Sequence, residues 1–114
     1  MFRLSLILIA LALQTSVAMA KQVDICAAEN EVDDGVRIST MGVVDEIIKC
    51  PDNLKRACLF IESLEDDPDY CILIVSPKGK IPSTCEEGAT ATVTAVVRYF
   101  MGYTDLVDAK ISCR

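Results

Sequence analysis

The 114-residue sequence has no histidine and no tryptophan, and its only aromatic residues are three Tyr and three Phe. Without histidine, neither the Ser-His and Cys-His pairs of hydrolases nor an imidazole metal site can form. Basic residues are also few: the sequence has 11 Lys and Arg and 17 Asp and Glu, which gives a net charge of −6. Nucleic-acid affinity needs clustered Lys and Arg side chains that neutralise phosphates, so we expect no nucleic-acid partner.

The acidic residues do not match a known cation-binding loop either. A calcium-binding EF-hand loop beginning at Glu29 would need glycine and glutamate where Asp34 and Thr40 stand. We therefore interpret the acid-rich N-terminal stretch as a solvated surface, and we expect no metal and no cofactor.

Residues 1–20 have the organisation of a secretory signal peptide. Arg3 gives a positive start, residues 4–13 are apolar almost throughout, and residues 18–20 fit the small-residue rule for cleavage. The apolar run is too short for a membrane span of about 20 residues, so we expect cleavage before Lys21. Cleavage removes one base and leaves a net charge of 10 − 17 = −7. The pattern predicts an exported protein, periplasmic or secreted, that does not span the membrane.

The remaining chain is long enough for one domain and too short for two. Residues 21–35 are polar and acidic, and we expect a loose arm with a single helical turn at residues 24–29. Residues 36–114 are expected to form the domain. Short apolar or alternating runs predict strands at residues 36–49, 58–61, 70–75, 89–100 and 106–113, with an irregular connection at residues 76–88.

The first expected strand contains a break at Gly42. Apolar and polar residues alternate before this glycine and lose phase after it. A glycine inside a strand, with a change of phase beside it, indicates a bulge or a sharp bend. Such a bend would allow one long strand to pair with partners on both sides.

The second and third strands are expected to form a hairpin around the acidic turn at residues 65–68. If the turn places Leu64 opposite Asp69, then Phe60 faces Leu73. One face of this hairpin is then purely aliphatic and is expected in the core; its members are Leu59, Ile61, Ile72 and Ile74. The other face would carry Phe60, Leu73 and Val75.

Five antiparallel strands with a glycine-bent first strand predict a five-stranded Greek-key barrel of the OB-fold type. The chain resembles the exported OB-fold domains of bacteria, which are small periplasmic proteins and lipoproteins related to the anticodon-binding type of OB domain. The resemblance lies in Gly42-Val43-Val44, in the hairpin with a polar turn, and in Glu87-Gly88-Ala89-Thr90-Ala91-Thr92-Val93-Thr94. It implies the fold and no catalytic residue. The alternative, a disulfide-stapled β-sandwich, needs more strands.

Six cysteines without a CxxC pair predict structural disulfides in an exported chain whose core is small. Cys50 and Cys58 flank a seven-residue loop between expected strands, so they can close it. In the register above, Cys58 and Cys71 are too far apart to bridge. The expected set is Cys50–Cys58, Cys71–Cys85 and Cys26–Cys113.

The hairpin face, its acidic turn and a distant aromatic stretch at residues 99–103 are the candidate contact regions. The residues expected to bind a partner are Phe60, Glu62, Asp66, Asp67, Asp69, Leu73 and Tyr103. We predict a non-catalytic exported binding module for a protein or a small ligand. A secreted inhibitor or immunity-type protein would use the same chemistry. A small hydrolase with Glu62 and Asp69 as paired carboxylates is the enzymatic alternative.

Export and oxidation can be checked together on the protein isolated from its own compartment. We expect the chain to begin at Lys21 and to carry no free thiol. Intact-mass measurement after alkylation checks both points. A retained leader, or alkylated cysteines in most molecules, would contradict them.

Overall fold

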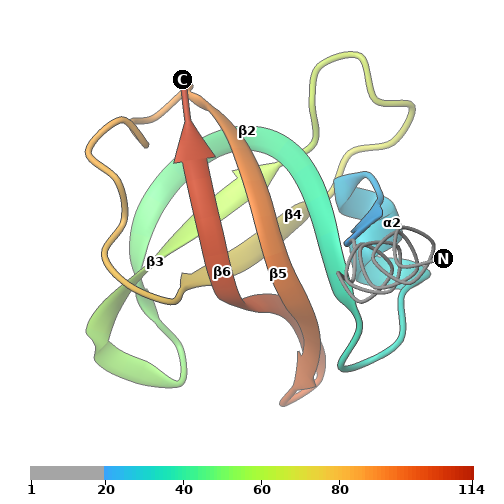
Figure 1. The fold of residues 1–114 in the computed structure, drawn as a ribbon, viewed down its shortest axis with the longest axis horizontal. Helices are drawn as coiled ribbons and strands as arrows, with labels where there is room; N and C mark the ends of the chain where they lie inside the picture. The colour runs from blue at the N-terminus through green and yellow to red at the C-terminus, as the bar shows by residue number, and fades with distance from the viewer. Residues whose placement is uncertain (1–19) are drawn as a thin grey trace, which may run out of the picture.

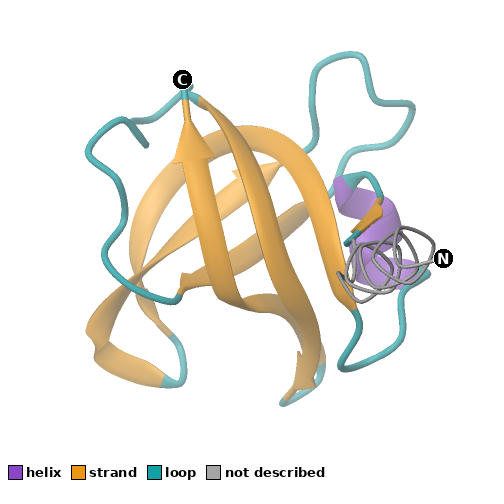
Figure 2. Ribbon diagram, viewed as in Figure 1, coloured by secondary structure: helices purple, strands orange, loops and turns teal. Residues whose placement is uncertain are grey.

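The computed structural model describes residues 20–114, so the expected signal peptide lies outside the described residues except for Ala20. The described chain is all-β apart from one short helix (Figures 1 and 2). The elements in chain order are β1 (Lys21–Gln22), α2 (Ile25–Asn30), β2 (Arg37–Cys50), β3 (Asn53–Glu62), β4 (Ile72–Pro77), β5 (Thr90–Phe100) and β6 (Tyr103–Cys113). Each of the five expected strands is present, which confirms the all-β class.

The strands form one mixed sheet in the order β1-β2-β3-β4-β6-β5, and β5 also pairs with β2. The expectation of five antiparallel strands is wrong in two respects. The two-residue β1 adds a sixth strand, parallel to β2, and β4 pairs with β6 in parallel. The parallel pair arises because the connection after β4 carries the chain across to β2, where β5 begins; β6 then returns antiparallel to β5.

Strand β2 changes partner halfway along its length, beside Gly42. Residues 37–43 pair with β5, and residues 43–50 pair with β3. A Cβ atom on Gly42 would lie 2.6 Å from the backbone oxygen of Glu62 and 3.2 Å from the Ile25 Cδ1 atom. Only glycine allows this approach. β2 runs unbroken through Gly42, and the irregularity predicted beside this glycine lies between Val44 and Glu46.

The helical turn expected at residues 24–29 is present as α2, and it packs against the core where a loose arm was expected. Asp24 caps α2, since its carboxylate accepts a hydrogen bond from the Ala27 N–H at 2.7 Å. Ile25 and Ala28 lie three residues apart on one helical face, and both are fully buried. The fully buried side chains around them come mainly from β2, β3 and β5, among them Ile38, Val44, Leu59, Ile61, Val93 and Val97.

The β3–β4 hairpin differs by one residue from the expected register. Phe60 pairs with Ile74, and Ile61 pairs with Leu73. A one-residue slip moves every side chain of one strand to the other face. Leu73 is therefore buried, whereas Ile72 is 37% exposed and faces outward.

The turn explains this register because it closes at Ser63 and Cys71 instead of Leu64 and Asp69. The Ser63 N–H donates to the Cys71 carbonyl at 3.0 Å, and the Cys71 N–H donates to the Ser63 Oγ at 2.9 Å. Cys71 is also bonded to Cys26 of α2. The helix and the serine hydroxyl together fix the end of the hairpin.

Three disulfides link the described chain: Cys26–Cys71, Cys50–Cys58 and Cys85–Cys113. The local pair Cys50–Cys58 was predicted correctly. The predicted pairs Cys26–Cys113 and Cys71–Cys85 are wrong because α2 lies beside the start of β4, and the end of β6 lies beside the β4–β5 connection. Three structural disulfides indicate an oxidising compartment. No helix among residues 20–114 is long and apolar enough to cross a membrane.

The steric role of Gly42 can be measured by adding a single methyl group. We expect Gly42→Ala to lower the free energy of unfolding by about 1–3 kcal/mol, because the new Cβ meets a backbone oxygen that cannot move freely. Gly79→Ala is the matched control, since a Cβ there meets nothing within 4 Å. Urea unfolding checks both, and equal midpoints for the two variants would contradict the steric argument.

Candidate functional site

Three of the expected binding residues, Glu62, Asp67 and Asp69, line one pocket of about 470 Å³ at the β3–β4 turn. The Tyr70 hydroxyl donates to Glu62 Oε2 at 2.8 Å, and this hydrogen bond raises the pKa of Tyr70. The Asp67 carboxylate accepts a hydrogen bond from the Leu64 N–H at 3.1 Å, which stabilises the turn itself. Within residues 20–114, no group of three or more His, Cys, Asp or Glu is placed to hold a metal ion.

The other four expected residues do not join this pocket. Leu73 is 2% exposed and belongs to the core, so its assignment to a binding site is wrong; the one-residue register difference is the cause. Phe60 is half-buried, and Asp66 is exposed on the turn outside the pocket lining. Tyr103 begins β6 and stacks edge-to-face on Phe100, with 6.2 Å between ring centroids. The expected set is therefore distributed over separate parts of the molecule.

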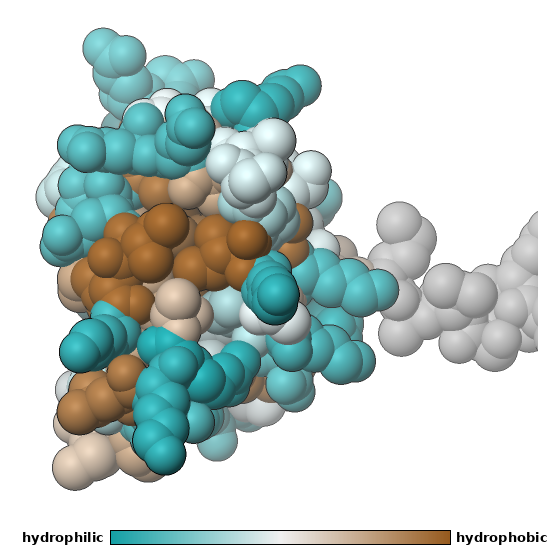
Figure 3. All heavy atoms as spheres, turned by 90° about the vertical axis from the view of Figure 1, so that its left-hand side faces the viewer, coloured by the Kyte–Doolittle hydropathy of each residue, from teal (hydrophilic) through white to brown (hydrophobic). Residues whose placement is uncertain are grey.

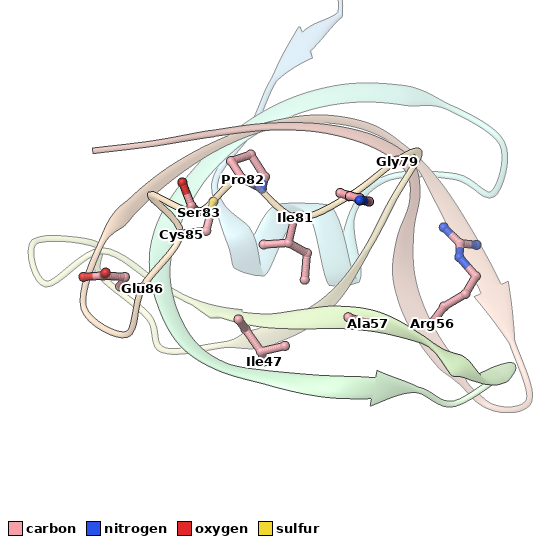
Figure 4. A pocket seen from close by; sticks show the side chains of 10 residues that line it. Ile47, Arg56, Ala57, Gly79, Ile81, Pro82, Ser83, Cys85 and Glu86 are labelled. Carbon is pink, nitrogen blue, oxygen red and sulfur yellow. The ribbon is translucent and has the colours of Figure 1, made fainter.

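A second concave region, which we call the apolar pocket, lies between the end of β2, the start of β3 and the β4–β5 connection (Figure 4). It has a volume of about 490 Å³, and its lining is Ile47, Arg56, Ala57, Gly79, Lys80, Ile81, Pro82, Ser83, Cys85 and Glu86. Figure 4 shows the Ile81 side chain directed from the connection toward Ile47 on β2 and Ala57 on β3.

The apolar character of this region continues at the surface. Ile47 is 56% exposed although it is a large aliphatic residue in a strand. Figure 3 shows a broad hydrophobic area on the side of the molecule that lies at the left in Figure 1, bordered by hydrophilic residues. A contiguous apolar area with a polar border is typical of an interaction site.

The connection that forms one wall of the apolar pocket is fixed at three points. At its start, the Lys78 N–H donates to a backbone carbonyl of β6 at 3.0 Å. At its end, the Gly88 N–H donates to the Val44 carbonyl of β2 at 2.8 Å. Between them, Cys85 is bonded to Cys113. The pocket is therefore formed before any ligand arrives, which reduces the entropy lost on binding.

A polar pocket of about 550 Å³ adjoins the apolar one. The two share Arg56 and Gly79, and Lys78 and Arg98 line the polar pocket as well. The shared residues make one continuous surface with an apolar half and a polar half. A ligand that carries an aliphatic group next to a charged group would contact both halves.

Arg98 is held by two carboxylates at the back of this region. Its guanidinium bonds Asp105 at 2.6 Å and Asp52 at 3.1 Å, and Asp105 is 2% exposed. The hydrogen bond to Asp105 is the main reason why the pKa of Arg98 is raised, and it outweighs the opposite effect of burial. The pair fixes the β2–β3 turn against β5 and β6. The guanidinium of Arg56 donates to the Pro77 carbonyl, and this hydrogen bond holds the charged group beside both pockets.

Charge is distributed unevenly over the molecule. Five of the ten basic residues after residue 20 lie at the end of β2, at the start of β3 or early in the β4–β5 connection: Lys49, Lys55, Arg56, Lys78 and Lys80. Ten of the 17 acids lie at residues 24–34 and 62–69, on the opposite side in Figure 1. The linings of the two pockets hold four basic residues and three acids, Asp52, Glu86 and Asp108, so a negatively charged partner would meet less repulsion there than at the acid-rich side.

The sequence contained a weak signal for the apolar pocket. Ile47 and Ile48 are adjacent in a strand, so one of them must face away from the other. Ile81 is an isolated aliphatic residue between Lys80 and Pro82 in an otherwise irregular segment. Neither signal shows that the two isoleucines meet, because they are brought together only by the path of the connection.

Comparison with protein-family models gives no match for this chain, and comparison with curated proteins gives no significant match. The geometry and charge of the described residues are therefore the basis for a functional hypothesis.

The disulfide at the pocket wall gives a direct test of its rigidity. Removing Cys85–Cys113, whose cysteines are 28 residues apart, as Cys85→Ser with Cys113→Ser should cost about 3–4 kcal/mol in the chain-entropy model. We also expect faster amide hydrogen exchange at residues 79–86. Cys50→Ser with Cys58→Ser is the matched control, with a cost of about 2–3 kcal/mol and unchanged exchange at residues 79–86. Equal exchange in both variants would show that hydrogen bonds alone hold the wall.

Proposed function

We propose that this protein is a non-catalytic binding module, exported to an oxidising compartment, that docks a partner at the apolar pocket. The observation that carries the proposal is the pocket itself, an aliphatic surface lined by Ile47, Ala57 and Ile81 with Arg56 and Lys80 beside it. Exposed aliphatic groups next to fixed positive charges suit a partner that carries both apolar and acidic groups.

We further propose that the sheet is a five-stranded barrel of the OB-fold type, with β1 and α2 added at its N-terminal side. Two observations support this. The pairings β2–β3, β3–β4, β4–β6, β6–β5 and β5–β2 return to the strand from which they start. The glycine-bent β2 belongs to both halves of that circuit. OB-folds bind their ligands through surface strands and the loops beside them, as a pocket between β2, β3 and a connection would do.

The enzymatic alternative would place a hydrolase site at the pocket of the β3–β4 turn, which we call the acidic pocket, with Glu62 and Asp69 as the carboxylate pair. Asp69 is exposed, and Glu62 already accepts the Tyr70 hydroxyl. A carboxyl that acts as a general acid usually lies in an apolar environment, and the exposed Asp69 lacks such an environment. A secreted inhibitor or immunity-type protein would use the apolar pocket in the same way as the proposed module and would differ only in its partner.

Affinity capture with matched variants tests the docking site. We expect the mature protein to capture a defined partner from its own envelope fraction. Ile47→Asp should lower the affinity for that partner by at least about tenfold, because it places a charge in the apolar surface. Met101→Asp is the control, since Met101 is 82% exposed at the β5–β6 turn and lies outside the apolar pocket.

The partner identified by mass spectrometry is then purified, and its Kd is measured for each variant. Asp69→Asn distinguishes the two pockets. If Asp69→Asn abolishes binding while Ile47→Asp retains it, the acidic pocket is the site and the proposal is wrong.

A further inference from the structure

Strand β3 has a free edge directly beside the apolar pocket. Its ladder with β4 covers only residues 59–62, whereas its ladder with β2 extends to Asn53. Within the described chain, Asn53, Ala57 and Cys58 therefore pair with a strand on one side only, and residues 54–56 pair with neither β2 nor β4. Residues 53–57 are all exposed.

The edge is free because the pairing of β4 with β3 ends at Val75. Proline has no N–H to donate to a ladder, and β4 turns from β3 toward β6, where Pro77 pairs with Ala109. The guanidinium of Arg56 takes the Pro77 carbonyl that a longer β4 would have offered to β3. The apolar pocket fills the space between this edge and the departing connection.

The backbone at the edge is also only partly used by the sheet. Leu54, Lys55 and Arg56 have no paired residue in β2, because the register shifts between Lys49 and Cys50. The Lys55 N–H donates to the Asn53 side chain at 3.1 Å. Exposed backbone groups at a sheet edge can pair with a strand of another molecule.

We infer that the partner binds by strand addition: an extended segment of a partner protein, with acidic and aliphatic residues in alternation, pairs with residues 53–57 of β3. This inference rests on the proposed function and specifies its binding mode. One aliphatic side chain of the segment enters the apolar pocket between Ile47 and Ile81. Its acidic side chains meet Lys55 and Lys80.

The charges at the edge favour such a partner over a second copy of this chain. In a symmetric pair of edges, Lys55 and Arg56 of one molecule would face the same residues of the other. Like charges opposite each other in a sheet are destabilising. An acidic segment reverses the sign of that interaction at Lys55 and Arg56.

Three labelled hexapeptides test the mode of binding by fluorescence anisotropy with the mature, disulfide-bonded protein. The first alternates valine and glutamate, the second alternates valine and lysine, and the third is the glutamate peptide with N-methyl groups at alternate backbone nitrogens. We expect the first to bind at least about tenfold more tightly than either of the others. N-methylation keeps every side chain and removes backbone donors, so it isolates strand pairing.

Two double variants test the location. Lys55→Glu with Lys80→Glu should weaken binding of the glutamate peptide by at least about tenfold. Lys21→Glu with Lys110→Glu is the matched control, because it changes the net charge by the same amount at exposed positions outside the pocket lining. The control should change binding by less than about threefold. Amide exchange at residues 53–57 should slow when the glutamate peptide is bound.

The outcomes separate this inference from the proposed function. Equal binding of the N-methylated peptide, or equal effects of the two double variants, overturns strand addition. If none of the peptides binds while the captured partner still requires Ile47, the docking site stands and strand addition is wrong. If the captured partner is indifferent to Ile47→Asp as well, both proposals are wrong.

Discussion

The whole architecture depends on the close contact between Gly42 and the Glu62 carbonyl. At this point β2 leaves β5 and joins β3, so a single strand holds the two halves of the sheet together. The glycine also leaves room for Ile25, which allows α2 to close over the core. A side chain at Gly42 would push apart the strand, the hairpin and the helix together.

Local features of the sequence predicted local features of the structure. The loss of phase at Gly42, the alternation of Ala91, Val93, Ala95 and Val97 in β5, and the bridge between Cys50 and Cys58 depend on residues close in the chain. The hairpin register was missed because it is fixed from outside, by the bond between Cys26 and Cys71 and by the Ser63 hydroxyl. An alternating pattern restricts a strand to two choices of face, and here a distant contact selects between them.

The candidate site was missed for the same reason. Its walls come from the end of β2, the start of β3 and the connection before β5, which are distant in sequence. The acidic turn was the more conspicuous feature of the sequence. Its Asp67 carboxylate stabilises the turn, however, and the carboxylates of Glu65, Asp66 and Asp69 are exposed. The basic residues are fewer, but five of the ten lie near the apolar pocket and the free edge of β3. The proposed binding site therefore rests on the position of the charged residues beside an exposed apolar surface, more than on their number.

The disulfide connectivity has a consequence for biosynthesis. If the cysteines were oxidised in the order in which they are synthesised, neighbours would join as Cys26 with Cys50 and Cys58 with Cys71, and only Cys85–Cys113 would be native. The native bridge from Cys26 instead encloses the bridge between Cys50 and Cys58. Cys26 must therefore stay reduced until Cys71 has been made, or a wrong bond must be exchanged afterwards through a mixed disulfide. Native pairing in this small domain thus requires that α2 meets the start of β4 before Cys26 is oxidised, or that a wrong bond is exchanged later, which takes minutes to hours without a catalyst.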